Sequence, residues 1–272
     1  MVVSKAHAFG NDFLLVPEAD VPLGYRGAVA RALCHRHHGV GADGLILYRV
    51  DPDGVAGMRL LNADGSRSEI SGNGVRCLAA WLAHQDRLTG AERRGFVVRT
   101  DAGEKRLELL ERDGARVTFR AAMGQPEQVA QRTLTVDGAP VDVVTLRVGN
   151  PQCVLLGSAT EDRLARYGRA LATHPAFPDG TNVELAEIEA PDRVRILIWE
   201  RGVGPTLASG TGACAAAVAA AAVGGASRDV QVAAPGGTQR VEWREDGLYL
   251  TGWAEVVLEG RWIATGGGAP GT

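Results

Sequence analysis

The sequence predicts an α+β fold of two similar domains, and three observations support this prediction. Strand-like segments are numerous, helical segments are few, and the two kinds do not alternate as they do in a parallel α/β sheet. Short glycine-containing motifs recur in the same order at a separation of about half the chain. The chain has 36 glycines in 272 residues and only 5% aromatic residues, which favours tight turns and close approach of the backbone to a small ligand.

Strands are expected where apolar and polar residues alternate or where β-branched residues cluster. These segments cover residues 45–50, 95–100, 106–111, 116–121, 141–148, 152–156, 182–188, 194–200, 239–244 and 248–259. They outnumber the helical segments, so most of each domain should be sheet.

Helices are expected at residues 25–38, 75–88, 161–171 and 213–223. Thr160 is a suitable N-cap for the third helix, because its hydroxyl can accept a first-turn N–H. The fourth segment is almost all alanine, the strongest helix former, and the glycine pair at 224–225 ends it. We expect the tail, residues 266–272, to be disordered.

An internal repeat is the most informative feature of the sequence. The matched pieces are residues 71–74 (SGNG) and 209–212 (SGTG), 138 apart; 10–11 and 149–150 (both GN), 139 apart; and 43–46 (DGLI) and 182–185 (NVEL), 139 apart. Three matches in one order, at offsets that agree within one residue, favour duplication of a single unit over chance, and the period is too long for a solenoid. We therefore expect domains at 1–115 and 116–256 that face each other as a pseudo-twofold pair, with 257–272 as a segment that could return to the first.

Each S-G-x-G motif is expected to open a helix. A helix start presents unpaired N–H groups and a partial positive charge, which can hold a carboxylate or phosphate. Two such starts on either side of one small molecule would suit inversion of a carbon next to a carboxylate, with one group removing a proton and the other returning one to the opposite face. The structural alternative is that both serines are only helix caps.

Seven motifs then carry a resemblance to a known family. They are KAHAFGNDF at 5–13, RHHGVGADGLI at 36–46, NADGSRSEISGNGVRC at 62–77, VGNPQCV at 148–154, FPDGTNVE at 177–184, WERGVGPTLASGTGAC at 199–214 and PGGTQRVEW at 235–243. In this order they resemble diaminopimelate epimerase, a cofactor-independent enzyme of lysine biosynthesis, from Lys5 to about Gly260. The resemblance implies two α+β domains, each with strands wrapped around a central helix and the active site between them. It also implies a homodimer, with a diamino dicarboxylic acid as the small-molecule substrate and interconversion of its LL and meso forms by two bases.

The largest departure from the family pattern concerns those two bases. The family has a cysteine just before each G-x-G helix start, one acting as thiolate base and the other as thiol acid, and this chain has Ser71 and Ser209 there. A serine hydroxyl is a much weaker acid than a thiol, whose pKa is about 8.5. We therefore expect little or no epimerase activity. Three alternatives stay open: engineered serines that trap substrate, a natural amino-acid-binding homologue that does not catalyse, and a racemase for another amino acid.

The resemblance also assigns substrate contacts. The α-carboxylate is expected at Gly72, Asn73, Gly74, Gly210 and Thr211; Asn11 and Asn150 lie near the reacting end; and Asn62, Asn182, Glu200 and Arg201 contact the distal end. Arg201 suits a two-pronged grip on the distal carboxylate. Gln152 stands where a histidine is common, and Gly44 where some members have glutamine. The structural alternative for each asparagine is a turn residue.

Composition and spacing exclude several classes of protein. A net charge of -3 argues against nucleic-acid binding, no apolar run is long enough for a membrane span, and no secretory signal is evident. The four cysteines have no C-x-x-C spacing, which favours a reduced, cytoplasmic setting, and those at 77 and 214 are expected to be buried. The G-x-G-x-x-G match at 39–44 follows a helix instead of preceding one, and the histidines at 35–38 lack a carboxylate partner. No cofactor and no metal are expected.

Overall fold

The computed structural model describes residues 1–52, 55–68, 71–85, 95–101 and 103–263. Its contacts divide the chain into two compact units. Unit 1 contains residues 1–119 and the chain from Trp253 onward, and unit 2 contains residues 120–252. The division falls four residues after the boundary expected at 115. The expected disorder of the tail concerns residues outside the described part of the chain.

Unit 1 is built mostly of strands. Its elements are β1 (Val2–Ala8), β2 (Asn11–Pro17), the short 3-10 turns η1 (Glu18–Asp20) and η2 (Leu23–Tyr25), α1 (Arg26–Cys34), β3 (Gly44–Val50), β4 (Ala56–Asn62), β5 (Arg67–Ser68), α2 (Gly72–His84), β6 (Gly95–Thr100) and β7 (Gly103–Asp113). Two further strands, β8 (Arg116–Gly124) and β17 (Gly247–Arg261), pair with each other, and β17 also pairs antiparallel with β1.

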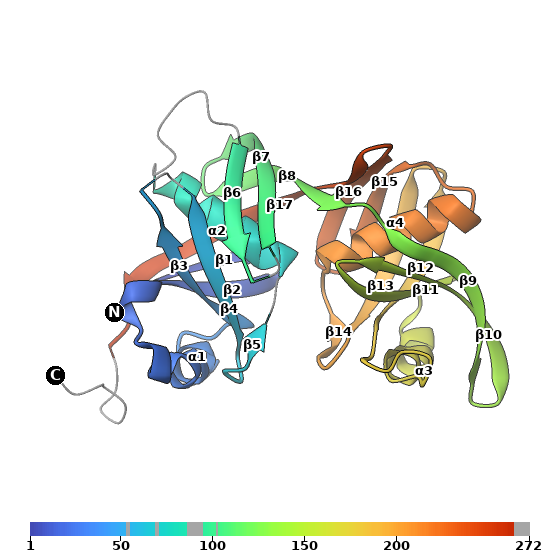
Figure 1. Ribbon diagram of the computed structural model, residues 1–272, viewed down its shortest axis with the longest axis horizontal. Helices are drawn as coiled ribbons and strands as arrows, with labels where there is room; N and C mark the ends of the chain where they lie inside the picture. The colour runs from blue at the N-terminus through green and yellow to red at the C-terminus, as the bar shows by residue number, and fades with distance from the viewer. Residues whose placement is uncertain (53–54, 69–70, 86–94, 102, 264–272) are drawn as a thin grey trace. The chain divides into compact units, whose positions relative to one another are not determined.

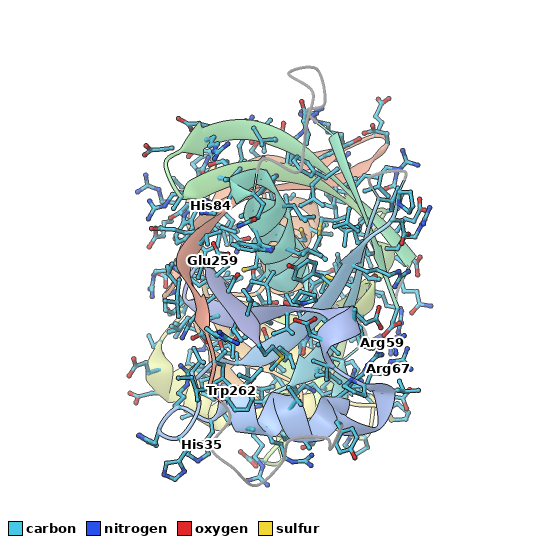
Figure 2. The ribbon with its side chains drawn as sticks, turned by 90° about the vertical axis from the view of Figure 1, so that its left-hand side faces the viewer. His35, Arg59, Arg67, His84, Glu259 and Trp262 are labelled. Carbon is cyan, nitrogen blue, oxygen red and sulfur yellow. The ribbon has the colours of Figure 1, made fainter. Side chains whose placement is uncertain are left out.

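The helix α2 lies inside unit 1, against β1, β2, β3, β4, β6 and β7 (Figure 1). Almost its whole length is buried, as expected for a helix that is apolar on all sides. The helix α1 packs separately on β3 and β4, with Leu33 and Cys34 in a second apolar layer. Figure 2 shows His84 at the last turn of α2, and His35 at the outer edge of the unit beside α1.

Unit 2 has the same character. Its elements are β9 (Glu127–Val136), β10 (Ala139–Val148), β11 (Asn150–Leu156), α3 (Glu161–Ala172), β12 (Asn182–Ala190), β13 (Arg193–Glu200), β14 (Gly204–Thr206), α4 (Gly210–Val223), β15 (Asp229–Ala234) and β16 (Gly237–Arg244). The alanine-rich α4 lies against β10, β11, β12, β13, β15 and β16, and α3 packs on the outside of β12 and β13 (Figure 1).

The two units repeat one order of elements, which confirms the prediction of two similar α+β units. In unit 1, α1 connects the parallel pair β2 and β3, and α2 connects the parallel pair β4 and β6. In unit 2, α3 connects the parallel pair β11 and β12, and α4 connects the parallel pair β13 and β15. The remaining strand pairs are mainly antiparallel, so the irregular order of strands and helices in the sequence indicated the fold class correctly.

Strand register refines one part of the predicted repeat. Phe13 pairs with Gly44 in unit 1, and Gln152 pairs with Asn182 in unit 2. Because Phe13 and Gln152 are 139 apart, Gly44 is the equivalent of Asn182, and the predicted match of Asp43 with Asn182 is wrong by one residue. The crossover through α3 is one residue shorter than the crossover through α1, which moves the offset from 139 to 138.

The first two predicted helices differ from the structure at their ends. The first ends at Cys34 instead of residue 38, because the amides of Val40 and Gly41 both bond to the carbonyl of Leu33 and close the helix. The second begins at Gly72 instead of residue 75 and ends at His84, and residues 86–88 of its predicted span lie outside the described residues.

The third predicted helix agrees with the structure to within one residue, and the fourth begins at Gly210, three residues before its predicted start. Thr160 caps α3 by accepting the amide N–H of Arg163. The helix α4 ends at Val223, and Gly225 adopts a φ of 79°, in the left-handed region where glycine is favoured. None of the helices in the described part of the chain has both the length and the apolar character needed to cross a bilayer.

Several strands were missed. They are β1, β2, β4, β5, β9, β14 and β15. Some read as continuous apolar runs because both faces are buried, as in β2, and others are polar because they lie at the surface, as in β9. Neither pattern shows the alternation on which the prediction depended.

Candidate active-site residues

Both S-G-x-G motifs open a buried central helix, as predicted. The Oγ of Ser71 accepts the amide N–H of Gly74 at 3.1 Å, at the start of α2. The Oγ of Ser209 accepts the amide N–H of Gly212 at 3.1 Å, at the start of α4. Both serines are therefore N-caps, which is the structural alternative, and each hydroxyl also lies at the positive end of its helix.

Around the start of α2, the predicted residues Asn11 and Asn73 contact each other. Asn73 donates from Nδ2 to Oδ1 of Asn11 at 3.1 Å, and Asn11 donates from its own Nδ2 to Asp43 at 2.8 Å. Arg76, only 1% exposed, donates to Oδ1 of Asn73 at 2.5 Å and lies 5.8 Å from the ring centre of Phe9. A buried guanidinium thus lies one turn behind the predicted anion-binding turn of Gly72, Asn73 and Gly74.

A cluster of paired charges holds Asp43, the residue that Asn11 contacts. Lys5 pairs with Asp12 at 2.8 Å, and Arg36 pairs with both Asp12 at 3.0 Å and Asp43 at 2.8 Å. Burial raises the pKa of Asp12, but the hydrogen bonds from Lys5 and Arg36 and the charges of these two residues outweigh it and hold the pKa below its usual value. The cluster fixes Asp43, which in turn orients Asn11.

Asn62 has a different environment from the other asparagines of unit 1. It lies at the end of β4, and its Nδ2 donates to Oγ of Ser66 at 2.9 Å across the turn that leads to β5. This contact agrees with the turn interpretation. Gly44 lies opposite Asn62, and a Cβ there would come within 2.9 Å of the Leu61 carbonyl oxygen. The backbone therefore leaves no room for the side chain that some family members carry at this position.

In unit 2, the residues expected at the distal end of the substrate come together at the paired ends of β12 and β13. Oδ1 of Asn182 accepts the backbone N–H of Arg201 at 2.9 Å. The guanidinium of Arg201 donates to the carbonyl of Asp179 at 2.5 Å and packs over Gly180. Glu200 precedes Arg201 and is half-buried.

A buried polar chain leads from the start of α4 to a carboxyl group. Oγ of Ser209 lies 3.4 Å from Oγ1 of Thr211. In the amide orientation that satisfies both neighbours, Gln152 accepts from the Thr211 hydroxyl at 3.2 Å and donates to Glu184 at 3.0 and 3.3 Å. In the same orientation, the amide oxygen of Gln152 accepts from the side-chain amide of Asn150 at 2.6 Å. The predicted residues Asn150, Thr211 and Ser209 are thus connected through Gln152.

Glu184 is the functional candidate that the sequence analysis missed in this unit. Its side chain has no exposure to solvent, and burial, with a smaller effect from the charge of Glu200, raises the pKa of its carboxyl well above the usual value. Arg76 was missed in unit 1. Glu184 and Arg76 each follow an apolar residue inside a segment predicted as regular strand or helix. No local sequence motif therefore distinguishes these buried charged residues from exposed ones.

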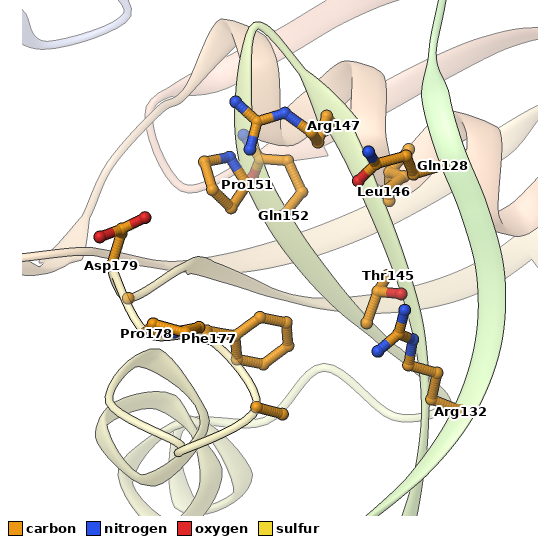
Figure 3. A pocket seen from close by; sticks show the side chains of 12 residues that line it. Gln128, Arg132, Thr145, Leu146, Arg147, Pro151, Gln152, Phe177, Pro178 and Asp179 are labelled. Carbon is orange, nitrogen blue, oxygen red and sulfur yellow. The ribbon is translucent and has the colours of Figure 1, made fainter.

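A cavity of about 240 Å³ in unit 2 borders this row of polar side chains, with Gln152 in its lining. It is lined by residues of β9, β10 and β11 and by the segment 176–180. Figure 3 shows Arg147 next to Pro151 and Gln152, with Phe177 and Asp179 across the cavity. Gln152 and the segment 176–180, whose Asp179 carbonyl holds Arg201, therefore line the same cavity.

The other motifs have structural roles. The glycine motif at 39–44 follows α1 and precedes β3, the reverse of the order in a dinucleotide site. Nδ1 of His35 accepts the backbone N–H groups of His37 and His38. Cys77 and Cys214 are buried, as expected. Among the described residues, no group of three or more potential ligands could hold a metal ion.

Comparison with known proteins identifies the family. A family model described as diaminopimelate epimerase matches residues 3–129 and 144–257. A protein named diaminopimelate epimerase from Desulforudis audaxviator is 40% identical, and the alignment covers 97% of this chain and 99% of that protein. A protein named diaminopimelate epimerase, chloroplastic, from Oryza sativa subsp. japonica is 38% identical over 94% of this chain and 78% of that protein.

Solved structures with low sequence identity share the fold. A probable proline racemase from Agrobacterium radiobacter K84 is 16% identical with a TM-score of 0.71, and covers 97% of this chain and 93% of that one. A hydroxyproline epimerase from Agrobacterium vitis is 17% identical with a TM-score of 0.69, and covers 96% and 91%. The family model extends over most of both units, and relatives match nearly the full length, so this chain belongs to the diaminopimelate epimerase family of isomerases.

Proposed function

We propose that this chain binds a diaminopimelate stereoisomer in the manner of a diaminopimelate epimerase, and that its proton transfer is impaired because serines occupy the positions of both family cysteines. The observation that carries the proposal is the pair of N-cap hydroxyls, Ser71 and Ser209, each 3.1 Å from a first-turn amide nitrogen in a duplicated unit. The same relation to two helices is what a two-base inversion would use.

The proton chemistry limits the reaction. Inversion removes the α-proton on one face and returns a solvent-derived proton on the other, so one group must be a base while the other holds a proton. A thiol with a pKa of about 8.5 can be brought near neutrality at a helix N-terminus. A hydroxyl is far less acidic, and within the described residues the Oγ of Ser71 and that of Ser209 each accept a backbone N–H at the cap, a contact that does not remove their protons.

Substrate selectivity is proposed to reside in unit 2. Arg201 offers a guanidinium for a distal carboxylate, and Asn182 and Glu200 lie beside it for a distal ammonium group. The α-carboxylate would be held by the helix starts at Gly72–Gly74 and at Gly210 and Thr211. The proposal requires both half-sites to act on one substrate molecule, which a crystal structure with bound meso-diaminopimelate would test directly.

The decisive experiment is to place cysteines at the two positions. The variants are Ser71→Cys, Ser209→Cys and the double variant, assayed for conversion of LL- to meso-diaminopimelate and for exchange of the α-proton with deuterated water. We expect the double variant to epimerise, and each single variant at most to exchange the proton of one stereoisomer. Thr160→Cys is the matched control, because it places a thiol at the N-cap of α3, outside the repeated motifs.

Two outcomes would contradict the proposal. If the double variant folds but neither epimerises nor exchanges the proton, the scaffold is not that of a diaminopimelate epimerase. If calorimetry of the unaltered chain shows tighter binding of a monocarboxylic amino acid than of meso-diaminopimelate, a racemase or binding protein for another amino acid is favoured. Binding of meso-diaminopimelate without turnover would support the proposal.

We also propose a place in lysine biosynthesis and a homodimeric state, both from the family resemblance, and a cytoplasmic location, from the spacing of the cysteines. Size-exclusion chromatography with light scattering tests the dimer, since a mass near the chain's own 28.6 kDa would contradict it. Growth of a strain that lacks the epimerase, with and without the double cysteine variant, tests the pathway.

A further inference from the structure

The cavity in unit 2 corresponds in position to the cluster of paired charges in unit 1. Asp12 and Pro151 directly precede the equivalent residues Phe13 and Gln152, so they hold the same place in the two units. In unit 1 the carboxylate of Asp12 pairs with both cations of the cluster, whereas in unit 2 Pro151 lines the cavity. Unit 2 therefore has a cavity at the place where unit 1 has a carboxylate.

Two further positions of the cluster are uncharged in unit 2. Asp43 corresponds to Thr181, since each directly precedes the first residue of the next parallel strand, β3 or β12. Lys5 corresponds to Thr145, since the residues with which they pair on β2 and β11 are 139 positions apart. Three of the four charged positions of the unit 1 cluster therefore have no charge in unit 2, and Thr145 lines the cavity.

Two arginines, Arg147 and Arg132, also line the cavity. Arg147 is half-buried and pairs across the strands with Pro151, and Arg132 of β9 is exposed and lies diagonally across from Thr145 (Figure 3). Within the described part of the chain, neither guanidinium has a hydrogen bond or an ion pair. A guanidinium presents paired N–H donors that match a carboxylate. The cavity thus offers two cationic groups to an anion from solution.

The acidic groups near the cavity do not balance these arginines. Among the described residues of the lining, Asp179 is the one carboxylate. Glu127 pairs with Arg147 across the strands, but it is exposed and lies outside the lining. Glu184 also lies outside the lining, and burial raises the pKa of its carboxyl well above the usual value. The lining therefore has two positive charges and one negative charge.

The backbone departs from regular strand pairing at this cavity. Ala130 and Glu127 of β9 pair with Thr145 and Arg147 of β10, so two residues on β9 lie opposite one on β10. One of these two, Gln128, has a φ of 55°, in the left-handed region that residues other than glycine rarely adopt, and it lines the cavity. Bulges of this kind redirect side chains and are frequent next to functional sites. The distortion therefore favours a binding role for the cavity.

The positions of the two arginines set the length of a suitable anion. Arg132 pairs with Val143, which precedes Arg147 by four residues on β10, or about 13 Å along a strand. A molecule with a carboxylate at each end fits this separation better than a single anion does. The volume of about 240 Å³ is small for a ligand site, and the ring of Phe177 lies across the cavity (Figure 3). A short chain of methylene groups between the two carboxylates fits both features.

We propose that the cavity of unit 2 is a binding site for a small dicarboxylate, which pairs one carboxylate with Arg147 and the other with Arg132. At the equivalent place in unit 1, the carboxylate of Asp12 belongs to the chain itself. None of the described residues assigned to the substrate lines this cavity, so the site uses a different set of residues from those proposed for diaminopimelate. This second site does not depend on the proposed function.

Titration calorimetry of the whole chain with glutarate tests the site. Glutarate has two carboxylates joined by methylene groups, and it has no amino group. We expect saturable binding, and at least about tenfold weaker binding after Arg147→Gln or Arg132→Gln. The loss should be larger for Arg147, because water screens a half-buried charge less than an exposed one. Absence of saturable binding, or binding that neither substitution weakens, would overturn the proposal.

A substitution taken from unit 1 tests the position of the anion. Pro151→Asp gives unit 2 the carboxylate that unit 1 has at this place, directly across from Arg147. We expect at least about tenfold weaker binding of glutarate, since the new carboxylate competes for the guanidinium. Pro151→Asn is the matched control, because asparagine has nearly the size of aspartate but no charge, and it should retain binding. Equal affinity of the two variants would contradict the proposed position.

Other anions test the class of ligand. Acetate has one carboxylate, so it should bind at least about tenfold more weakly than glutarate. Equal affinity for acetate would overturn the pairing of one ligand with both arginines. Inorganic phosphate that binds as tightly as glutarate, with the same dependence on Arg132 and Arg147, would overturn the assignment to a dicarboxylate.

Arg201→Gln separates this site from the residues proposed for the substrate. Arg201 lies outside the lining, so glutarate binding should be nearly unchanged. Loss of glutarate binding in this variant, with binding retained in Arg147→Gln, would overturn the cavity as the site. Glutarate binding at the cavity together with a failed epimerase test would count only against the proposed function.

Circular dichroism and the melting temperature establish that each variant is folded. If Arg147→Gln does not fold, Arg147→His replaces it, since His7 holds that place in unit 1. Glutarate binding that is as tight in this histidine variant at pH 8 as in the unaltered chain would overturn the role of Arg147, because histidine is mostly uncharged at that pH.

Discussion

Replacement of Gly212 by alanine should destabilise unit 2, although alanine is the better helix former by about 1 kcal/mol. The new Cβ would lie 2.6 Å from Oε1 of Glu184 and 3.2 Å from Cβ of Ser209. The carboxyl is fully buried, so it can move only by leaving the amide of Gln152 and compressing its neighbours. Displacement of a buried polar group and local overpacking each cost about 1–3 kcal/mol, and the helix propensity of alanine offsets about 1 kcal/mol, so we expect a net loss of about 1–5 kcal/mol in the free energy of unfolding.

The duplicated unit supplies the matched control. In Gly74→Ala the new Cβ would lie 3.3 Å from the terminal methyl of Ile46, which can shift by a few tenths of an ångström, so the unfolding free energy should change by less than about 1 kcal/mol. Urea denaturation measures both variants. In a double-mutant cycle, Glu184→Ala should relieve most of the cost of Gly212→Ala. Equal stability of the two alanine variants, or no coupling to Glu184, would refute this account of the α4 start.

Three further predictions follow from the described contacts. The four cysteines are buried, with the pKa of Cys34 raised to about 12 by burial, so iodoacetamide at about pH 8 should modify none of them until the chain unfolds, as mass spectrometry would show. Ser71→Ala and Ser209→Ala should each lower the unfolding free energy by about 1 kcal/mol through loss of the cap, measured by chemical denaturation. The pKa of Asp12 is lowered in the folded state, so its stabilising contribution is present above about pH 4 and is lost as the pH falls through the folded-state pKa. Asp12→Asn should therefore reduce the loss of unfolding free energy at acid pH, measured by chemical denaturation at a series of pH values.

Local sequence signals predicted the elements that position the site. The SGNG and SGTG motifs marked the start of α2 and α4, because a serine cap followed by glycines has few other uses at the head of an apolar helix. The repeat offset predicted two similar units, and strand pairing changes it by only one residue between β2 and β3. The end of α1 was overestimated because His35–His38 can continue a helix by propensity, whereas bonds to Leu33 close it.

The buried charges could not be predicted in the same way. Glu184 lies in a strand whose other face is also covered, and a single sequence does not tell a buried carboxyl in such a strand from an exposed one. Arg76 lies in a helix that is buried on all sides, where a charged residue would ordinarily mark the solvent-facing side. Each became visible only when the fold showed what surrounds it.

Duplication of the unit separates what the fold requires from what the chemistry requires. Where both copies carry apolar residues, as at Leu15 and Val154, packing alone accounts for them. Where one copy has an apolar residue and the other a buried polar one, as at Phe13 and Gln152 or Ile46 and Glu184, the polar residue carries a desolvation cost that the fold has shown it can avoid. A buried polar residue that the fold does not need is expected where it serves a purpose other than packing. Gln152 and Glu184 contact each other, and Glu184 lies against the start of α4. The difference between the copies, more than either motif alone, therefore singles out the start of α4 for tests of a functional role.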